Sequence, residues 1–199
     1  DKGGAIVAGN SVNVTISGSL FNGNSATKGG AIAVTGNGVD FVLNTSTFVN
    51  NSVSSNGGGA MYLGGSNANS SITNTTVFNN TVNYPSLNQS TGGGIRIEGA
   101  RPFTIQNSLI YGNLVTNGTE TAGSDIGIVP NTVLNLSHSI TKKIEPNLDD
   151  TAGDVFSTSI VGADLTSSNL MFVTSSGYVE YDSVSSSEDS PIDFGSDGN

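Results

Sequence analysis

The chain has 199 residues, no cysteine, 11% charged residues and a formal net charge of −10. The lack of cysteine excludes a disulfide framework and thiol chemistry. The chain has no run of 18 or more apolar residues, so no membrane-spanning helix is expected. Residues 1–144 hold all six Lys and Arg together with five acids, whereas residues 145–199 hold eleven acids and no base. This acidic end argues against nucleic acid as a partner and is typical of a solvated surface.

The first repeated feature in chain order is a glycine-rich phrase that opens a short apolar segment. Its four clear copies start at Gly3, Gly29, Gly58 and Gly92, and a weaker fifth copy starts at Gly123. The apolar residue three positions later recurs with spacings of 26, 29, 34 and 31 residues, at Ile6, Ile32, Met61, Ile95 and Ile126. Self-similarity at such a period is the signature of a solenoid, in which each repeat stacks on its neighbours.

A second repeated feature is an apolar residue followed three positions later by asparagine. Its copies are Phe21 with Asn24, Phe48 with Asn51, Val77 with Asn80, and Ile110 with Asn113. A hydroxyl residue always precedes the apolar one by two positions, at Ser19, Ser46, Thr75 and Ser108, with Ser139 in the same column. We expect the asparagines to pass amide hydrogen bonds from turn to turn, and to tolerate left-handed backbone at a corner.

Each repeat contains three short apolar segments with alternating side chains, which is the period of β-strands. The sequence therefore predicts an all-β, right-handed parallel β-helix of about five rungs of 26–34 residues, with three short strands per rung. Residues 1–144 are predicted to form the repeats, and residues 145–199 an acidic C-terminal rung and cap continuous with the helix. The glycine pairs, Gly29–Gly30 and Gly58–Gly59, are expected to supply left-handed freedom where a loop re-enters the first strand.

The segment between the corner asparagine and the next glycine pair varies in length. It has four residues at Ser25–Lys28, six at Ser52–Gly57 and about eleven at Thr81–Thr91. Insertions that open from one edge of a solenoid often mark the side where partners bind. We interpret this segment as a variable loop.

These phrases resemble the passenger repeats of the polymorphic membrane protein family, which are surface-exposed autotransporter adhesins defined by many copies of GGA(I, L or V) and FxxN. The matching residues are GGAI at 3–6 and 29–32, GGAM at 58–61, FNGN at 21–24 and FVNN at 48–51. The resemblance implies a β-helix displayed at the cell surface, outside the cell, which acts in adhesion or as a structural spacer. Its partners would be a cell-surface receptor or a glycan. Residues 169–199, with SPIDFG at 190–195, are also similar to the closing segment of bacterial surface β-helix proteins.

Parallel β-helices also include pectate lyases and polygalacturonases, so catalysis must be weighed. Such enzymes need several carboxylates on one face, but before residue 120 the only acids are Asp1, Asp40 and Glu98. We therefore expect a non-enzymatic protein, and a polysaccharide-binding or polysaccharide-degrading β-helix remains the alternative.

Two groups of residues are candidates for binding, and the single histidine is considered beside them. The tight charge cluster Arg96, Glu98 and Arg101 lies one repeat after Tyr62, and Arg96 is expected to lie at the surface against the Tyr62 ring. His138 falls in a corner column with turn residues, without a carboxylate beside it, so we expect no catalytic role. A flat bank of outward hydroxyls and amides on the second strand could lie along a polysaccharide; it comprises Thr15, Val42, Ser71, Thr104 and Asn135, beside Ser17, Asn44, Thr73, Gln106 and Ser137.

No cofactor is expected. The carboxylates of Asp149, Asp150 and Asp154 could bind calcium. They are weak candidates, because their spacing does not match the calcium-binding loop of an EF-hand. The chain opens directly on a repeat, and a bare solenoid end exposes strand edges. We therefore expect either a fragment of a longer passenger or a filament subunit that stacks end to end on further copies of itself.

Overall fold

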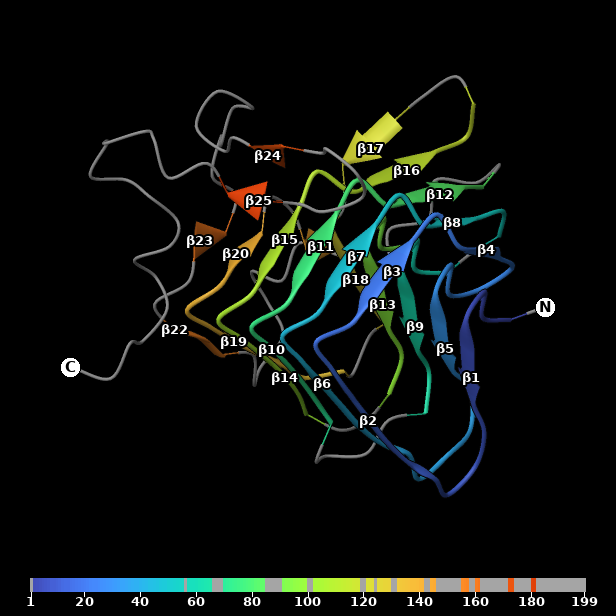
Figure 1. Cartoon of the computed structure of the whole chain (residues 1–199), viewed down its shortest axis with the longest axis vertical. Helices are drawn as coiled ribbons and strands as arrows, with labels where there is room; N and C mark the ends of the chain where they lie inside the picture. The colour runs from blue at the N-terminus through green and yellow to red at the C-terminus, as the bar shows by residue number, and fades with distance from the viewer. Residues whose placement is uncertain are drawn as a thin grey trace.

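The computed structural model describes residues 2–55, 57–65, 70–84, 91–99, 102–118, 121–123, 125–129, 132–141, 144–145, 155–157, 160–161, 172–173 and 180–181. Every regular element in this part of the chain is a β-strand, and the strands stack in rows, as Figure 1 shows. The chain is a right-handed parallel β-helix, which confirms the predicted fold class. None of the described residues forms a helix that is long and apolar enough to cross a membrane.

Three sheets contain the strands that the repeat predicts, and each strand pairs in parallel with its counterpart one turn away. The first sheet contains β1 (Ile6–Ala8), β5 (Ile32–Val34), β9 (Met61–Leu63), β13 (Ile95–Ile97), β18 (Ile126–Ile128) and β21 (Ile144–Glu145). The second contains β2 (Asn13–Ser17), β6 (Asp40–Asn44), β10 (Ser71–Thr73), β14 (Phe103–Gln106), β19 (Leu134–Ser137) and β22 (Val155–Ser157). The third contains β3 (Leu20–Asn22), β7 (Thr47–Val49), β11 (Thr76–Phe78), β15 (Leu109–Tyr111), β20 (Ile140–Thr141) and β23 (Ile160–Val161).

The expectation of three strands per rung needs correction, because a fourth short strand follows the corner asparagine in the first four turns. The fourth sheet contains β4 (Ser25–Ala26), β8 (Ser52–Val53), β12 (Thr81–Asn83), β16 (Leu114–Thr116) and β17 (Thr121–Gly123). These segments begin what the sequence indicated as a variable loop. Two or three residues are too few to show alternation, although Val53, Val82 and Val115 form a small buried cluster of their own.

The predicted alignment of the repeats is confirmed by the strand register. Ile6 pairs with Ile32, and Ile32 with Met61. Phe21 pairs with Phe48, and their rings stack with centroids 4.5 Å apart and an interplanar angle of 9°. Because like positions pair, the inward side chains of successive turns form continuous apolar files, which make up the main core.

The glycine pairs are required for space, and their predicted left-handed role is wrong. None of Gly29, Gly30, Gly58 and Gly59 has a positive φ. Gly29 forms a parallel bridge with Gly58. A Cβ on Gly29 would overlap the carbonyl oxygen of Ile32 and would lie 2.9 Å from the backbone N of Tyr62 in the next turn. Two backbone segments approach at this point so closely that a side chain does not fit.

Most of the left-handed residues instead form two columns at the corners of the solenoid. One column, with φ between 47° and 57°, comprises Gly18, Thr45, Asn74, Asn107 and His138. This confirms that His138 is a corner residue. The other column directly precedes the repeated asparagines and comprises Gly23, Asn50, Asn79 and Gly112. The expectation that the repeated asparagines take left-handed backbone is therefore wrong. It is needed one residue earlier, where glycine and asparagine are tolerated best.

The predicted asparagine ladder is present and buried. Asn51 Oδ1 accepts from the backbone N and the Nδ2 of Asn24, at 3.0 and 2.9 Å. In the same way Asn80 Oδ1 accepts from Asn51, and Asn113 Oδ1 from Asn80, with all four distances between 2.9 and 3.0 Å. Because Asn51 and Asn80 are fully buried, these bonds satisfy polar groups that would be costly to leave unpaired.

A second ladder consists of the hydroxyl column. Ser46 Oγ accepts from the backbone N of Ser19 at 3.2 Å and donates to the carbonyl of Asn44 at 2.9 Å. Ser108 repeats this arrangement with Thr75 and Gln106. Both ladders have the same polarity, since each side chain accepts from the preceding turn.

The asparagine ladder ends in the fifth turn, where the repeat shortens. Only two residues separate Thr141 of β20 from Ile144 of β21, which leaves no room for a corner asparagine, a fourth strand and a glycine pair. Asp125 takes the place of the missing amide, and its Oδ1 accepts from the N and Nδ2 of Asn113 at 2.9 Å each. Thr141 Oγ1 lies 3.5 Å from Asp125 Oδ2.

The fourth sheet closes in the same region, because β17 pairs with β16 in antiparallel orientation. The second and third sheets continue to β22 and β23. Further along, β24 (Phe172–Val173) and β25 (Glu180–Tyr181) form an antiparallel pair. The assignment of residues 145–199 as a terminal rung and cap stays a prediction, and the SPIDFG segment lies outside the described residues.

Candidate functional site

The candidate binding cluster lies on the outer side of the first sheet. Tyr62 in β9 and Arg96 in β13 are paired one turn apart. Their strand neighbours, such as Met61 and Ile95, belong to the main core, so strand alternation directs Tyr62 and Arg96 outward. Glu98 follows β13, and its backbone N donates to the carbonyl of Leu63 at 3.0 Å. The parallel register thus brings an aromatic ring, a guanidinium and a carboxylate together.

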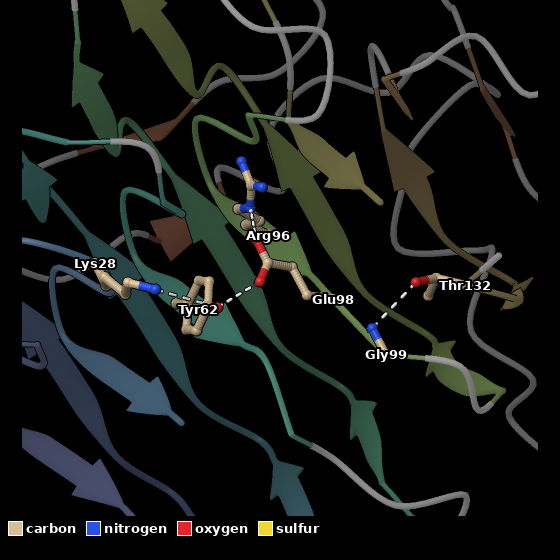
Figure 2. A network of polar contacts seen from close by, with 6 residues as sticks. All are labelled: Lys28, Tyr62, Arg96, Glu98, Gly99 and Thr132. Carbon is tan, nitrogen blue, oxygen red and sulfur yellow. Dashed lines mark hydrogen bonds and ion pairs between the residues drawn. The ribbon is translucent and has the colours of Figure 1, made fainter. Parts of the chain in front are cut away.

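Glu98 connects the other two side chains, as Figure 2 shows. Its Oε1 lies 2.5 Å from Arg96 Nε, and its Oε2 accepts from the Tyr62 hydroxyl, also at 2.5 Å. The Arg96 side chain is 9% exposed and that of Glu98 is 30% exposed. The expectation that Arg96 lies at the surface is therefore wrong, because its side chain is largely buried beside Glu98.

Lys28 completes the cluster and was missed by the sequence analysis. Its Nζ lies 4.5 Å from the centroid of the Tyr62 ring and 3.4 Å from the Tyr62 hydroxyl. The cation over the ring is thus Lys28, whereas Arg96, which we expected there, reaches Glu98. The register of the repeat could have placed Lys28 near Tyr62. Lys28 directly precedes Gly29, Gly29 pairs with Gly58 of the next turn, and Gly58 lies four residues before Tyr62.

The surroundings of Tyr62 raise the pKa of its phenol above the usual value of 10.0. Burial is the main cause, and the hydrogen bond to Glu98 and the negative charge of that carboxylate raise the pKa further. The positive charge of Arg96 acts in the opposite direction. The phenol therefore stays protonated at neutral pH and acts as a hydrogen-bond donor, which makes it a poor general base.

This arrangement favours a brace between turns over acid–base chemistry. Both oxygens of Glu98 are engaged, and the cluster joins Lys28, Tyr62 and the segment 96–98, which come from three successive repeats. The backbone N of Gly99 donates to Thr132 Oγ1 at 3.2 Å, which extends the contacts by one further turn (Figure 2). Solvent reaches mainly Glu98 and Lys28, which are half-buried.

The remaining predicted site residues give less information. Arg101, Asp149, Asp150 and Asp154 lie outside the described residues, so the calcium prediction stays a prediction. Within the described ranges, no group of three or more His, Cys, Asp or Glu side chains is placed to hold a metal ion. The Nδ1 of His138 and the Oδ1 of Asn107, in successive turns of one corner column, are buried without a hydrogen-bond partner.

The outward face of the second sheet forms the predicted bank of hydroxyls and amides. Thr15 pairs with Val42, Val42 with Ser71, Ser71 with Thr104, and Thr104 with Asn135. Thr15 is exposed and the other four are half-buried. Because neighbouring strands lie about 4.8 Å apart, this face presents short polar side chains at a regular spacing.

Comparison with known proteins identifies no relative of this chain. No family model, no curated protein and no solved structure matches it. A functional proposal therefore has to be argued from the geometry of the solenoid and its outer faces.

Proposed function

We propose that this protein is a non-enzymatic, extracellular β-helix of the cell surface, which acts as an adhesin-like display surface or as a structural spacer. The observation that carries the proposal is the buried ladder from Asn24 to Asp125. It extends through every regular turn and uses the amides of the repeated asparagines for bonds within the solenoid. A stack of turns that is held together by such a ladder suits a rigid support for variable outer loops.

The candidate cluster also supports a non-catalytic role. The Tyr62 phenol is held in its protonated form, and Glu98 accepts from two partners at once. Hydrolysis of a glycosidic bond needs one carboxyl that donates a proton and another that attacks or activates water. Among the described residues the cluster contains one carboxylate, which is already paired.

The test combines a search for turnover with a measurement of adhesion. The full chain is incubated with a panel of acidic and neutral polysaccharides, and unsaturated products and new reducing ends are measured. In parallel, beads coated with the chain are tested for retention on cultured cells, with albumin-coated beads as the control. We expect retention on cells without turnover, and clear turnover of any polysaccharide would overturn the proposal.

A second candidate function is polysaccharide binding at the second sheet, which is favoured by the regular bank of short polar side chains there. Gel mobility in the presence of each polysaccharide measures such binding. Ser71→Lys and Thr104→Lys together should abolish a shift caused by contact with this face. Thr76→Lys on the third sheet is the matched control, since Thr76 is also half-buried on a β-strand. An equal loss in both variants would exclude the second sheet as the binding face.

A further inference from the structure

Asparagine followed by glycine is the dipeptide in which an asparagine side chain is most easily converted without an enzyme. Glycine has no side chain that would hinder the attack of its backbone nitrogen on the preceding amide. The chain contains four such pairs, which begin at Asn22, Asn37, Asn56 and Asn117. Asn56 lies outside the described residues. The other three pairs stand in different surroundings.

The conversion is deamidation through a cyclic imide. The backbone nitrogen of the glycine loses its proton and attacks the Cγ of the asparagine. A bond forms between these two atoms, the bond from Cγ to Nδ2 breaks, and the amide nitrogen leaves as ammonia with that proton. Water then opens the ring at either carbonyl, which gives aspartate or isoaspartate. The reaction therefore needs a glycine nitrogen without a hydrogen bond and an asparagine side chain that can rotate.

The pair Asn37–Gly38 meets both requirements. It lies in the corner between β5 and β6, and both residues are exposed. Within the described part of the chain, no hydrogen bond involves the backbone N of Gly38 or the side chain of Asn37. The nearest atom to a Cβ placed on Gly38 would be Ser11 Oγ at 3.6 Å, so the space around this glycine is open.

The pair Asn22–Gly23 is held at both reacting groups. The backbone N of Gly23 donates to the carbonyl of Val49 at 3.2 Å. Asn22 Oδ1 accepts from Asn50 Nδ2, also at 3.2 Å. Asn22 is exposed like Asn37, so exposure does not distinguish the two pairs. The reaction at Asn22 has to wait until both bonds open.

The third pair, Asn117–Gly118, is held at the nitrogen. The backbone N of Gly118 donates to Thr116 Oγ1 at 3.1 Å. Asn117 is half-buried and has an interaction partner of its own. The attacking group is thus engaged in this pair as well.

We propose that Asn37 is a site of spontaneous deamidation in the folded protein, and that it reacts faster than Asn22 and Asn117 because the nitrogen of Gly38 is unpaired. The products are aspartate and isoaspartate, each with a new carboxylate. The reaction consumes only water and releases ammonia, so it needs no enzyme. This inference concerns a modification of one corner and does not depend on the proposed surface function.

Isoaspartate at this position should disturb the contact between two turns. The backbone N of Asn37 donates to Asn10 Oδ1 at 2.8 Å, and its carbonyl accepts from the backbone N of Ser11 at 2.9 Å. The corner is tightly stacked, since a Cβ on Gly36 would overlap the backbone of Gly9. Isoaspartate lengthens the main chain by a methylene group, whereas aspartate leaves the main chain unchanged. We therefore expect isoaspartate alone to loosen this corner.

The experiment measures deamidation of the full chain at each pair. The folded protein is incubated in mildly alkaline buffer, digested with pepsin at acidic pH, and the peptides are quantified by mass spectrometry. A parallel incubation in concentrated urea gives the rates of the unfolded chain, in which only the local sequence acts. Methyl transfer by an isoaspartyl methyltransferase measures the share of isoaspartate.

We expect Asn37 to deamidate about tenfold or more faster than Asn22 in the folded chain, because the bonds at Asn22 have to open first. In urea the two rates should agree within about threefold, since both asparagines precede glycine. Equal rates in the folded chain, or a faster reaction at Asn117, would overturn the inference. The same ratio of rates in urea would overturn it too, because the local sequence would then select Asn37.

A variant tests the role of the hydrogen-bonded nitrogen directly. Thr116→Val removes the acceptor of Gly118 and should raise the rate at Asn117 about threefold or more. Thr116→Ser keeps the hydroxyl and is the matched control, with an unchanged rate. An equal rate in both variants would show that the bond to the glycine nitrogen does not control the reaction.

The consequence for the corner is measured by hydrogen exchange at Ser11. Deamidated forms are separated by ion exchange, since they carry an additional negative charge. Protection of the Ser11 amide should fall about tenfold or more in the isoaspartate form. Asn37→Asp carries the same charge on a normal main chain and should keep the protection of the parent. Equal protection in all forms would show that the corner accommodates isoaspartate. The adhesion and turnover assays are independent of all these results.

Discussion

The regular turns and the fifth turn differ in how the chain passes from the third sheet to the first. In the regular turns it makes a corner at asparagine, adds a fourth strand and re-enters through a glycine pair. In the fifth turn two residues are enough to connect Thr141 with Ile144. In each regular turn the repeated asparagine is buried or half-buried, and its backbone N and Nδ2 need an acceptor in the following turn. The fifth turn has no such asparagine. The Asp125 carboxylate, which accepts but does not donate, ends the ladder there.

This difference shows that such a repeat needs a specific residue where its ladder stops. Each asparagine in the ladder both accepts and donates hydrogen bonds. An asparagine at the last position would therefore need a further acceptor for its own N–H donors. A carboxylate accepts only, and charge-assisted hydrogen bonds are stronger than neutral ones. The following predictions test the contrast, from the largest expected effect to the smallest.

Removal of an interior amide should have the largest effect. Asn80→Ala leaves two N–H groups of Asn51 without an acceptor. It also removes the Nδ2 donor from the Oδ1 of Asn113, which keeps only the backbone N of residue 80 as a donor. Each unsatisfied buried group costs about 1–3 kcal/mol, so we expect a loss of about 4 kcal/mol in the free energy of unfolding. Urea denaturation measures this loss.

The neighbouring asparagine provides the matched control. Asn79 is exposed and left-handed, and glycine occupies its column at Gly23 and Gly112. Asn79→Gly should therefore change the free energy of unfolding by about 0.5 kcal/mol or less. Similar losses in the two variants would mean that the buried ladder contributes no more than the exposed corner.

Removal of the ladder end should have an intermediate effect. Asp125→Ala leaves the two donors of Asn113 unpaired in a buried position, which should cost about 3 kcal/mol. Asp125→Asn keeps an acceptor oxygen for Asn113 but loses the charge, so the expected cost is about 1 kcal/mol. The same denaturation measurement ranks the two variants. If Asp125→Asn is the more damaging, then Asp125 does not act as a simple acceptor.

A smaller effect is expected at Thr141, which occupies the column of Phe21, Phe48, Val77 and Ile110. In the presence of Asp125, Thr141→Val removes a hydroxyl 3.5 Å from the carboxylate and should cost about 1 kcal/mol. In the Asp125→Ala background the same change should be neutral or stabilising, because an apolar residue then suits the column. A double-mutant cycle measures the coupling, and independent effects would contradict the contact.

The smallest effect at neutral pH is expected outside the core, at the brace around Tyr62. Tyr62→Phe removes the hydrogen bond to Glu98 and should cost about 1 kcal/mol at pH 7. The folded protein raises the pKa of this phenol above its unfolded value near 10. Its contribution to stability is therefore complete below pH 10 and decreases as the pH rises beyond 10. Urea denaturation at pH 8 and pH 11 should show a smaller difference between wild type and Tyr62→Phe at the higher pH. An equal difference at both values would contradict the assignment.

The sequence predicted the register, the asparagine ladder and one corner column because stacking places like residues over like. Phe21, Phe48 and Asn51 could be assigned without coordinates, since a solenoid turn contacts only its neighbours. The fold class follows from the same regularity.

Features that depend on less regular contacts could not be predicted. The fourth strand has two or three residues per turn, with a buried valine in β8, β12 and β16, and is too short to show a pattern of its own. The register places Lys28 near Tyr62, but the contact itself depends on a long, flexible side chain and does not follow from the register. Asp125 lies in a column of small residues, and its role becomes visible only when the shortened fifth turn is known. The cation expected at the Tyr62 ring was Arg96, whereas the ring is contacted by Lys28.

The direction of the ladders also has a mechanical consequence. Hydrogen bonds between strands and between corner side chains all run along the solenoid axis, so tension along this axis loads the interfaces between turns in series. Each interface then carries the full force, and the turns separate one after another. The interface between the fourth and fifth turns lacks continuous pairing in the fourth sheet, because β17 closes it. Under tension, this interface should open before those between the regular turns, and Asp125 lies at the position where the ladder would break.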